Sequence, residues 1–302
     1  MLNLTSEVRQ ALVDNKPVVA LESTIIAHGF PYPENYNLGL ELEALLRAEG
    51  VVPATIAILD GKLKVGLTQE DLLSIAKAGT IRKASLRDVP ALVSLKLDGA
   101  TTVATTMQIA HMAGIKVFVT GGIGGVHRHA EDTFDVSADL KALATFNVMV
   151  VCAGAKSVLD LPKTLEVLES QGTLVLGYQT ENFPAFYLRD SGLKVDYRMD
   201  EVTQIVRAFR VKEELGIPGG MVVTTPIPQG DELDAERFHT WLEMILTEVE
   251  NQRILGKDVT PFILRRLHET SQGETVRANM ALVKNNLILG AELAKAYCAG
   301  VK

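Results

Sequence analysis

The sequence predicts an α/β protein in which a mixed β-sheet lies between layers of helices. Segments typical of strands and of helices alternate from one end of the 302-residue chain to the other. The residues are 47% hydrophobic but only 5% aromatic, which favours short buried strands covered by helices. Asp60-Gly61 between two strand-like runs is a strong hairpin signal, so part of the sheet is expected to be antiparallel.

The elements before residue 115 are predicted from apolar runs, turn dipeptides and helix caps. Most of them alternate in type, as an α/β fold requires. In chain order they are a buried strand at Pro17–Leu21, a helix from about Pro33 to Ala48 that Gly50 closes, a hairpin of Thr55–Leu59 and Lys62–Gly66, a helix to Lys77 that Thr68 and Asp71 open as a capping box, a helix capped by Ser85, and a helix capped by Thr101 that runs to about Ala113.

Three strand–loop–helix units are predicted next, followed by a last strand and three helices. Pro162 is expected to break or kink the helix after the second strand, because proline removes a hydrogen bond inside a helix. The strands are Lys116–Thr120, Asn147–Cys152, Thr173–Tyr178 and Met221–Thr225, and the later helices cover Asp200–Leu215, Asp234–Leu255, a segment with Pro261 in its first turn, and Thr275–Ala299. No linker interrupts this pattern, which indicates one domain over residues 1–302.

Composition and charge exclude several classes of protein. The formal net charge is −7, whereas surfaces that bind nucleic acids or anionic membranes need a basic footprint. No apolar run reaches the ~18 residues of a transmembrane helix, and the N-terminus lacks a signal-peptide pattern. Cys152 and Cys298 cannot form a disulfide framework and are expected to be reduced and buried. We therefore expect a cytoplasmic protein.

A glycine-rich loop, Gly121–Gly125, follows the apolar run Lys116–Thr120. Open α/β sheets place ligands at this end of their strands, and glycines let backbone amides approach an anion closely. The spacing matches neither the dinucleotide fingerprint nor the phosphate-binding loop that ends in Gly-Lys-Ser/Thr. The loop is therefore either an anion site or a tight structural turn.

Two histidines and four carboxylates lie between His127 and Asp139. Such a cluster suits a hard cation bound by oxygen ligands, with Asp135 or Asp139 at its centre. The alternative is a solvated acidic loop followed by a helix, in which Ser137 caps the helix and Asp139 favours its positive end. The residues alone favour this second interpretation.

Glu22 and Lys156 stand close behind predicted strands. Lys156 follows Asn147–Cys152 through the small turn Ala153-Gly154-Ala155, so it is expected to face a cleft. Loss of hydration there disfavours the ammonium form and frees the amine to attack a carbonyl, although anion binding is an alternative. Glu22 is placed for proton transfer, since partial burial raises the pKa of a carboxyl group, with a structural ion pair as the alternative.

Lys83 and Asn279 are weaker candidates for the binding of phosphate. Lys83 lies between Arg82 and Ser85, and Asn279 lies in the last predicted helix. Position alone favours a surface role for each of them.

Eight runs of residues, taken together, carry a family resemblance. They are Val19–Gly29, Pro53–Ala57, Gly99–Met107, Val119–His127, Asp135–Leu140, Val151–Ser157, Ala278-Asn279 and Leu282–Asn286. In this order they resemble the pseudouridine-5′-phosphate glycosidase family, also called indigoidine synthase A-like. The resemblance covers nearly the whole chain.

The resemblance implies a three-layer α/β/α sandwich with a central mixed sheet, assembled as a homotrimer. It implies that Glu22 donates and accepts protons, that Lys156 is the nucleophile, and that Asp135 binds a divalent cation, usually Mn²⁺. The residues that it implies in substrate binding are Lys83, Val103 (through its backbone), Ser137, Ala138 and Asp139, with Thr120, His127 and Asn279 near the phosphate.

The activity implied by the resemblance is the reversible cleavage of pseudouridine 5′-phosphate to uracil and ribose 5-phosphate, through ring opening and a lysine Schiff base. One residue departs from the family pattern: Thr225 stands where an asparagine often precedes the proline, which leaves substrate detail open. Two alternatives also stay open. One is a C-glycoside synthase that joins ribose 5-phosphate to another aromatic acceptor, and the other is a non-catalytic phosphosugar-binding module.

Overall fold

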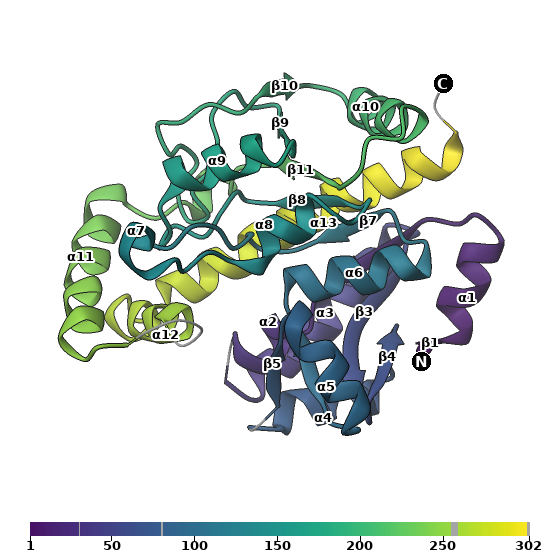
Figure 1. Ribbon diagram of the computed structural model, residues 1–302, viewed down its shortest axis with the longest axis horizontal. Helices are drawn as coiled ribbons and strands as arrows, with labels where there is room; N and C mark the ends of the chain where they lie inside the picture. Colours follow the sequence, from purple (N-terminus) through teal and green to yellow (C-terminus); the bar gives the residue numbers. More distant parts are fainter. Residues whose placement is uncertain (30, 80, 255–258, 301–302) are drawn as a thin grey trace.

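The fold is organised around one large β-sheet (Figure 1). The structure is a computed structural model that describes residues 1–29, 31–79, 81–254 and 259–300. The described residues form a sheet of 11 strands. In order across the sheet they are β1 (Leu2–Leu4), β4 (Lys62–Val65), β3 (Val52–Leu59), β2 (Val18–Leu21), β7 (Val117–Val119), β8 (Met149–Cys152), β11 (Met221–Thr224), β9 (Leu174–Tyr178) and β10 (Tyr197–Met199), while β6 (Gly99–Thr101) pairs with β3 and with β5 (Arg82–Ala84).

The sheet is mixed, as predicted. All neighbours from β3 through β2, β7, β8, β11 and β9 to β10 are parallel, whereas β3 is antiparallel to both β4 and β6. The β3–β4 hairpin turns at Asp60 and Gly61, whose φ angles are 51° and 66°. Two successive positive φ angles are typical of the type I′ turn that joins tightly paired strands.

Helices cover both faces of the sheet (Figure 1). The helix α6 packs on one face together with α8, and α3 packs beside α13 on the other. None of the helices in the described part of the chain is long and apolar enough to cross a membrane. The helices are α1 (Ser6–Val13), α2 (Thr24–His28), α3 (Glu34–Ala48), α4 (Gln69–Lys77), α5 (Val89–Ser94), α6 (Val103–Ala113), α7 (Ala130–Thr133), α8 (Ala138–Leu143), α9 (Leu161–Ser170), α10 (Val202–Glu214), α11 (Ala235–Asn251), α12 (Val259–Thr270) and α13 (Glu274–Ala299), with short 3₁₀ turns at Leu86–Asp88 and Gln229–Asp231.

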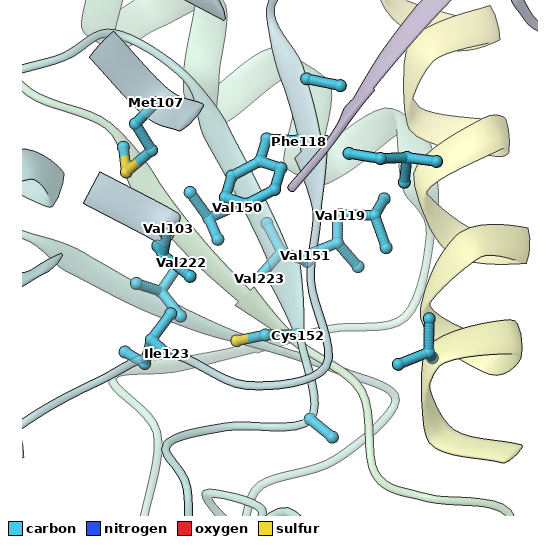
Figure 2. Close-up of a cluster of buried hydrophobic side chains, with 14 of the residues drawn as sticks. Val103, Met107, Phe118, Val119, Ile123, Val150, Val151, Cys152, Val222 and Val223 are labelled. Carbon is cyan, nitrogen blue, oxygen red and sulfur yellow. The ribbon is translucent and has the colours of Figure 1, made fainter. Parts of the chain in front are cut away.

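The core lies between α6, the central strands and α13 (Figure 2). Met107 of α6 faces strand residues such as Phe118, Val150 and Val222, and all four side chains are fully buried. Cys152 is also buried, as expected, whereas Cys298 is only half-buried; both thiols are free. Strands that are apolar on both faces are typical of a parallel sheet covered by helices on each side.

Two predictions about helix starts were wrong. The cap of α6 is Thr102, because Thr101 belongs to β6 and its hydroxyl donates to the carbonyl of Ile56 at 2.7 Å. Pro162 does not break a helix, because it lies in the first turn of α9, where a backbone N–H has no partner within the helix.

Short strands were the elements that the sequence did not reveal. The strands β1, β5, β6 and β10 have three residues each, too few for a pattern of period two to stand out. The predicted capping box of Thr68 and Asp71 is present at α4. The predicted end of a helix at Leu255 lies outside the described residues, and α11 ends at Asn251.

Replacement of Gly154 tests how closely the loop after β8 fits its neighbours. Gly154 has φ +82°, and a Cβ there would overlap the carbonyl oxygen of Pro184, whereas Gly172 has φ +71° with nothing within 4 Å of its Cβ position. We expect Gly172→Ala to cost about 1 kcal/mol through backbone strain, and Gly154→Ala roughly 3 kcal/mol or more, because the clash adds to that strain. Urea unfolding measures both, and equal losses would contradict the close contact.

Candidate active site

The candidate site forms where three parallel strands end side by side. In the register of the sheet, Val119 of β7 pairs with Leu21 of β2 on one side and with Val151 of β8 on the other. Because the strands are parallel, the segments that follow them leave at the same edge, where α/β proteins place their ligands. Glu22 and Lys156 both line the cavity of about 640 Å³ at this edge.

Nine of the eleven predicted site residues line this cavity. They come from five separate stretches of the chain, which the fold brings together. The nine are Glu22, Lys83, Val103, His127, Asp135, Ser137, Ala138, Asp139 and Lys156. The other two lie just behind the wall: Thr120 bonds to Glu22, and Asn279 packs against the backbone of Gly121.

Glu22 is held by a hydrogen bond from its neighbour on β7. The Thr120 hydroxyl donates to Glu22 Oε1 at 2.5 Å. Burial of the carboxyl raises the pKa of Glu22, while the positive charge of Lys156 and the Thr120 hydrogen bond oppose that rise. A carboxyl group with a raised pKa holds its proton to higher pH than an exposed one, and the opposing interactions help it to release that proton, as a general acid–base requires.

Lys156 reaches the cavity from a loop that is tied to the glycine loop. Backbone N–H groups of Ala153 and Lys156 donate to carbonyls of Gly121 and Ile123 at 2.9 and 3.1 Å. The second lysine of the cavity, Lys83, lines the cavity but is also exposed to solvent. Even so, burial within the cavity lowers the pKa of Lys83, and the nearby charge of Lys156 lowers it further.

Asp139 lies in the first turn of α8, as the structural interpretation of the sequence expected, and it also binds two other segments of the chain, which was not expected. Its two carboxylate oxygens accept hydrogen bonds from the backbone N–H groups of Ala104 and Gly124, at 2.9 and 2.8 Å. Ser137 caps α8, and its hydroxyl accepts from the Asp139 N–H at 3.2 Å. A Cβ at Gly124 would overlap the Ser137 hydroxyl, so tight packing requires glycine here.

Asp135 differs from Asp139 in having uncommitted oxygens. Within the described residues its carboxylate accepts no hydrogen bond, and the one basic side chain within 4 Å of it is His127, with Oδ2 3.9 Å from Nδ1. Burial lowers the pKa of His127 and so favours the neutral imidazole, whereas the negative charge of Asp135 acts in the opposite direction.

The donor set at Asp135 fits a hard cation that keeps most of its water. The described residues contain no group of three or more His, Cys, Asp or Glu side chains that could hold a metal on their own. Mg²⁺-like ions commonly use one or two carboxylates, completed by water and substrate oxygens. Asp135 at the cavity wall supplies one such carboxylate.

Several residues of the cavity wall were not singled out from the sequence. Arg87 follows Ser85 in a capping turn, Lys141 lies one turn into α8, and Thr260 comes from the first turn of α12. None of the three forms a motif, and only the assembled fold places them together. The family-variant residue Thr225 is buried beside Asn285, outside this wall.

The sequence comparison identifies the family. Residues 7–296 match the family described as indigoidine synthase A like protein. The chain belongs to this family. Two relatives of this kind, from Clostridium botulinum and Sorangium cellulosum, are both named pseudouridine-5′-phosphate glycosidase. They are 52% and 53% identical to the chain, over 97% and 98% of it and over 96% and 93% of their own lengths.

Solved structures of the indigoidine synthase A-like fold are also similar. The prealnumycin C-glycosynthase AlnA, solved in complex with ribulose 5-phosphate, has a TM-score of 0.92 at 36% identity, over 99% of this chain and 97% of its own. An indigoidine synthase A-like protein from Thermotoga maritima has a TM-score of 0.89 at 34% identity, over 97% and 95%. These values confirm the predicted three-layer fold.

The pH dependence of the unfolding free energy, compared between wild type and Glu22→Gln, tests whether the carboxyl group of Glu22 is buried. The pKa of Glu22 is raised, so its stabilising contribution is complete below the ordinary pKa of 4.5 and is lost as the pH rises through the raised value. Wild type should therefore lose stability relative to Glu22→Gln as the pH rises from about 4 to 8. Urea unfolding at a series of pH values measures the difference.

Glu213→Gln is the control of opposite sign. Burial opposes ionisation there too, but hydrogen bonds from Lys116, Tyr297 and Asn147 hold the pKa of Glu213 below its ordinary value. Its contribution is complete above pH 4.5 and is lost as the pH falls through the lowered pKa. A similar slope for both variants would show that Glu22 is not buried as described.

Proposed function

We propose that this protein reversibly cleaves the C–C glycosidic bond of pseudouridine 5′-phosphate, releasing uracil and ribose 5-phosphate. The observation that carries the proposal is that Glu22 and Lys156, an acid–base candidate and an amine nucleophile candidate, line one cavity. Relatives about half identical over nearly the whole chain are named for this activity.

The bond to be broken explains why both groups are needed. Carbon is a poor leaving atom and offers no lone pair for protonation, so acid catalysis alone cannot expel uracil. An amine bonded to the anomeric carbon supplies its lone pair as the C–C bond breaks, so an iminium forms on the sugar while the electrons of the breaking bond pass to uracil; in reverse, this iminium accepts electrons from uracil. A carboxyl group beside it moves the protons that each step requires.

The proposed sequence of steps begins with opening of the ribose ring, in which Glu22 transfers a proton to the ring oxygen. The Lys156 amine then bonds to the anomeric carbon, which still carries uracil. After protonation of uracil at C5 the C–C bond breaks: its electrons pass to the uracil ring, and the lone pair of the lysine nitrogen forms the iminium. Water hydrolyses this iminium to free ribose 5-phosphate and regenerate the amine. The position of Glu22 next to Thr120, within reach of the same cavity, supports a single acid–base group for these transfers.

The phosphate and sugar are proposed to bind at the cationic side of the cavity. Lys83 supplies charge, and Val103 supplies a backbone N–H from the first turn of α6, where helical amides lack intrahelical acceptors. We propose that Asp135 holds Mn²⁺ or another divalent cation. When bound, that cation would neutralise phosphate charge and help to orient the sugar. The substrate is thus a small phosphorylated C-nucleoside, and the homotrimer expected from the family stays a prediction.

A second candidate is a C-glycoside synthase that uses ribose 5-phosphate with another aromatic acceptor. The similarity to AlnA, at 36% identity, favours it over an unrelated activity. The higher identity to the glycosidases favours the first candidate. Release of intact uracil from pseudouridine 5′-phosphate separates the two, whereas binding without any product would support the non-catalytic module.

Lys156→Ala tests the proposed function together with the nucleophile. With pseudouridine 5′-phosphate and Mn²⁺, wild type should release uracil, and the variant should lose turnover by on the order of 10⁴-fold or more while it stays folded. Uracil is measured by chromatography and folding by circular dichroism. Full activity of the variant would refute the assignment of the nucleophile.

Borohydride trapping distinguishes the two lysines of the cavity. Wild type incubated with ribose 5-phosphate and borohydride should carry the reduced adduct on Lys156, located by peptide mass spectrometry. In Lys83→Ala the adduct should still form on Lys156, with a higher ribose 5-phosphate requirement, because Lys83 is proposed to bind phosphate. An adduct on Lys83 in wild type would reverse the two roles.

Asp135→Asn tests the proposed metal ligand. Loss of groups that merely support a ligand already weakens metal binding about 10- to 100-fold, so loss of the ligand itself should raise the Mn²⁺ needed for half-maximal activity at least as much. Asp132, exposed in the preceding short helix α7 and outside the cavity wall, provides the control in Asp132→Asn. Equal Mn²⁺ requirements in the two variants would contradict the role of Asp135.

A further inference from the structure

A buried asparagine on α13 contacts the backbone at the end of β7. Asn286 is fully buried, and its Nδ2 donates to the carbonyls of Thr120 at 2.8 Å and Gly121 at 3.3 Å. One side chain thus holds two consecutive carbonyls at the point where the chain leaves the strand for the glycine loop. It does not line the cavity, so no step of the proposed reaction involves it directly.

The helix that carries Asn286 is fixed at a short distance from β7. A Cβ at Gly290 would overlap the side chain of Val119, so the helix and the strand approach as closely as a glycine allows. On the other side, a Cβ at Gly121 would lie 3.2 Å from Val283 of α13. Figure 2 shows α13 running beside Val119. Asn286 lies between Val283 and Gly290 on this face, and packing on both sides limits its movement.

Thr120 is held through its backbone from two sides. Its N–H donates to the carbonyl of Val151 on β8 at 3.0 Å, and its carbonyl accepts from Asn286. With the backbone fixed, a single torsion of a β-branched side chain decides where the hydroxyl points. In this structure the hydroxyl points at Glu22.

Asn286 lowers the stability of the fold more than expected for a residue with a purely structural role. In the part of the chain that the structure describes, its Oδ1 is buried without a hydrogen-bond partner. A buried unsatisfied polar atom costs about 1–3 kcal/mol. Positions that sacrifice stability in this way are expected near functional sites.

We propose that Asn286 is a positioning residue that fixes the Thr120–Gly121 peptide and thereby directs the Thr120 hydroxyl at Glu22. Its effect on turnover rests on the proposed function, whereas its effect on the ionisation of Glu22 does not. Without Asn286 the peptide can rotate and the hydroxyl can turn away. The charged form of Glu22 then loses a hydrogen bond that stabilises it, which raises the pKa of Glu22 further.

The first experiment needs no substrate. The pKa of Glu22 is measured by ¹³C NMR of labelled carboxyl groups, with Glu22→Gln to assign the signal. We expect a higher pKa of Glu22 in Asn286→Leu than in wild type. The matched control is Asn35→Leu, because Asn35 is also buried and its Nδ2 also donates to two carbonyls, those of Ile26 and Ala76, at 2.8 and 3.0 Å. Asn35→Leu should leave the pKa of Glu22 unchanged.

The second experiment measures uracil release. Misplacement of a catalytic group by about 1 Å can cost roughly 100-fold, so we expect kcat of Asn286→Leu to fall about 10- to 100-fold with little change in KM. The alkaline limb of its pH profile should move to higher pH, because Glu22 begins the reaction as a proton donor. Thr120→Val should produce the same shift, Thr120→Ser should restore the wild-type profile, and Asn286→Leu combined with Thr120→Val should add nothing, because both act through one hydrogen bond.

The outcomes separate this proposal from the proposed function. Absence of uracil release by wild type refutes the function, and the titration then still decides the role of Asn286. An unchanged pKa of Glu22 in Asn286→Leu, or multiplied effects in the double variant, overturns the positioning role. If Asn286→Leu does not fold, Thr120→Val decides alone: a wild-type alkaline limb in that variant shows that Thr120 does not act on Glu22.

Discussion

The site depends on the parallel alignment of β2, β7 and β8, because this alignment brings a carboxyl group and an amine to one edge of the sheet. Glu22 leaves the first of these strands, and Lys156 leaves the third after a short loop. A carboxylate buried alone would be strongly destabilised. The charge of Lys156 and the hydroxyl of Thr120 offset part of that cost, so the group can exchange its proton instead of staying neutral.

Asp135 and Asp139 lie in one short segment but differ in their hydrogen bonds to the backbone, and this difference gives them different possible roles. Asp139 joins the first turn of α6 to the glycine loop by accepting a hydrogen bond on each oxygen, and it is nearly inaccessible. Asp135, four residues earlier, has no such commitment in the described structure and faces the cavity. The cluster by itself could not choose between them as a metal ligand, since both are acids in it, and it was the family resemblance that implied Asp135. Their surroundings in the fold leave the carboxylate of Asp135 free of hydrogen bonds at the cavity wall, which is consistent with the proposed role.

Much of the fold and part of the site could be predicted from local signals. Long apolar runs located the central strands, and residues that follow such runs, including Glu22 and Lys156, were the correct places to look for cavity residues. Family resemblance supplied Lys83 and Val103, which position alone did not favour. Thr260 and Asn286 could not be found in this way, because their relation to the site depends on how distant helices pack against it. Pro162 was misjudged because a proline signals either a break or a first turn, and only the position of the cap decides.

The carboxylates of the cavity wall bear on how an acidic protein could bind the proposed dianionic substrate. Asp139 is bound to backbone amides of the cavity wall, and Asp88 accepts from the N–H of Ser85 at 2.9 Å within a capping turn. Hydrogen bonds of this kind spread the negative charge of a carboxylate into the protein backbone. Glu22 can carry a proton, because burial raises its pKa. Asp135 is then the carboxylate that the proposed divalent cation would neutralise, and Lys83, Arg87, Lys141 and Lys156 bring basic groups to the same cavity wall.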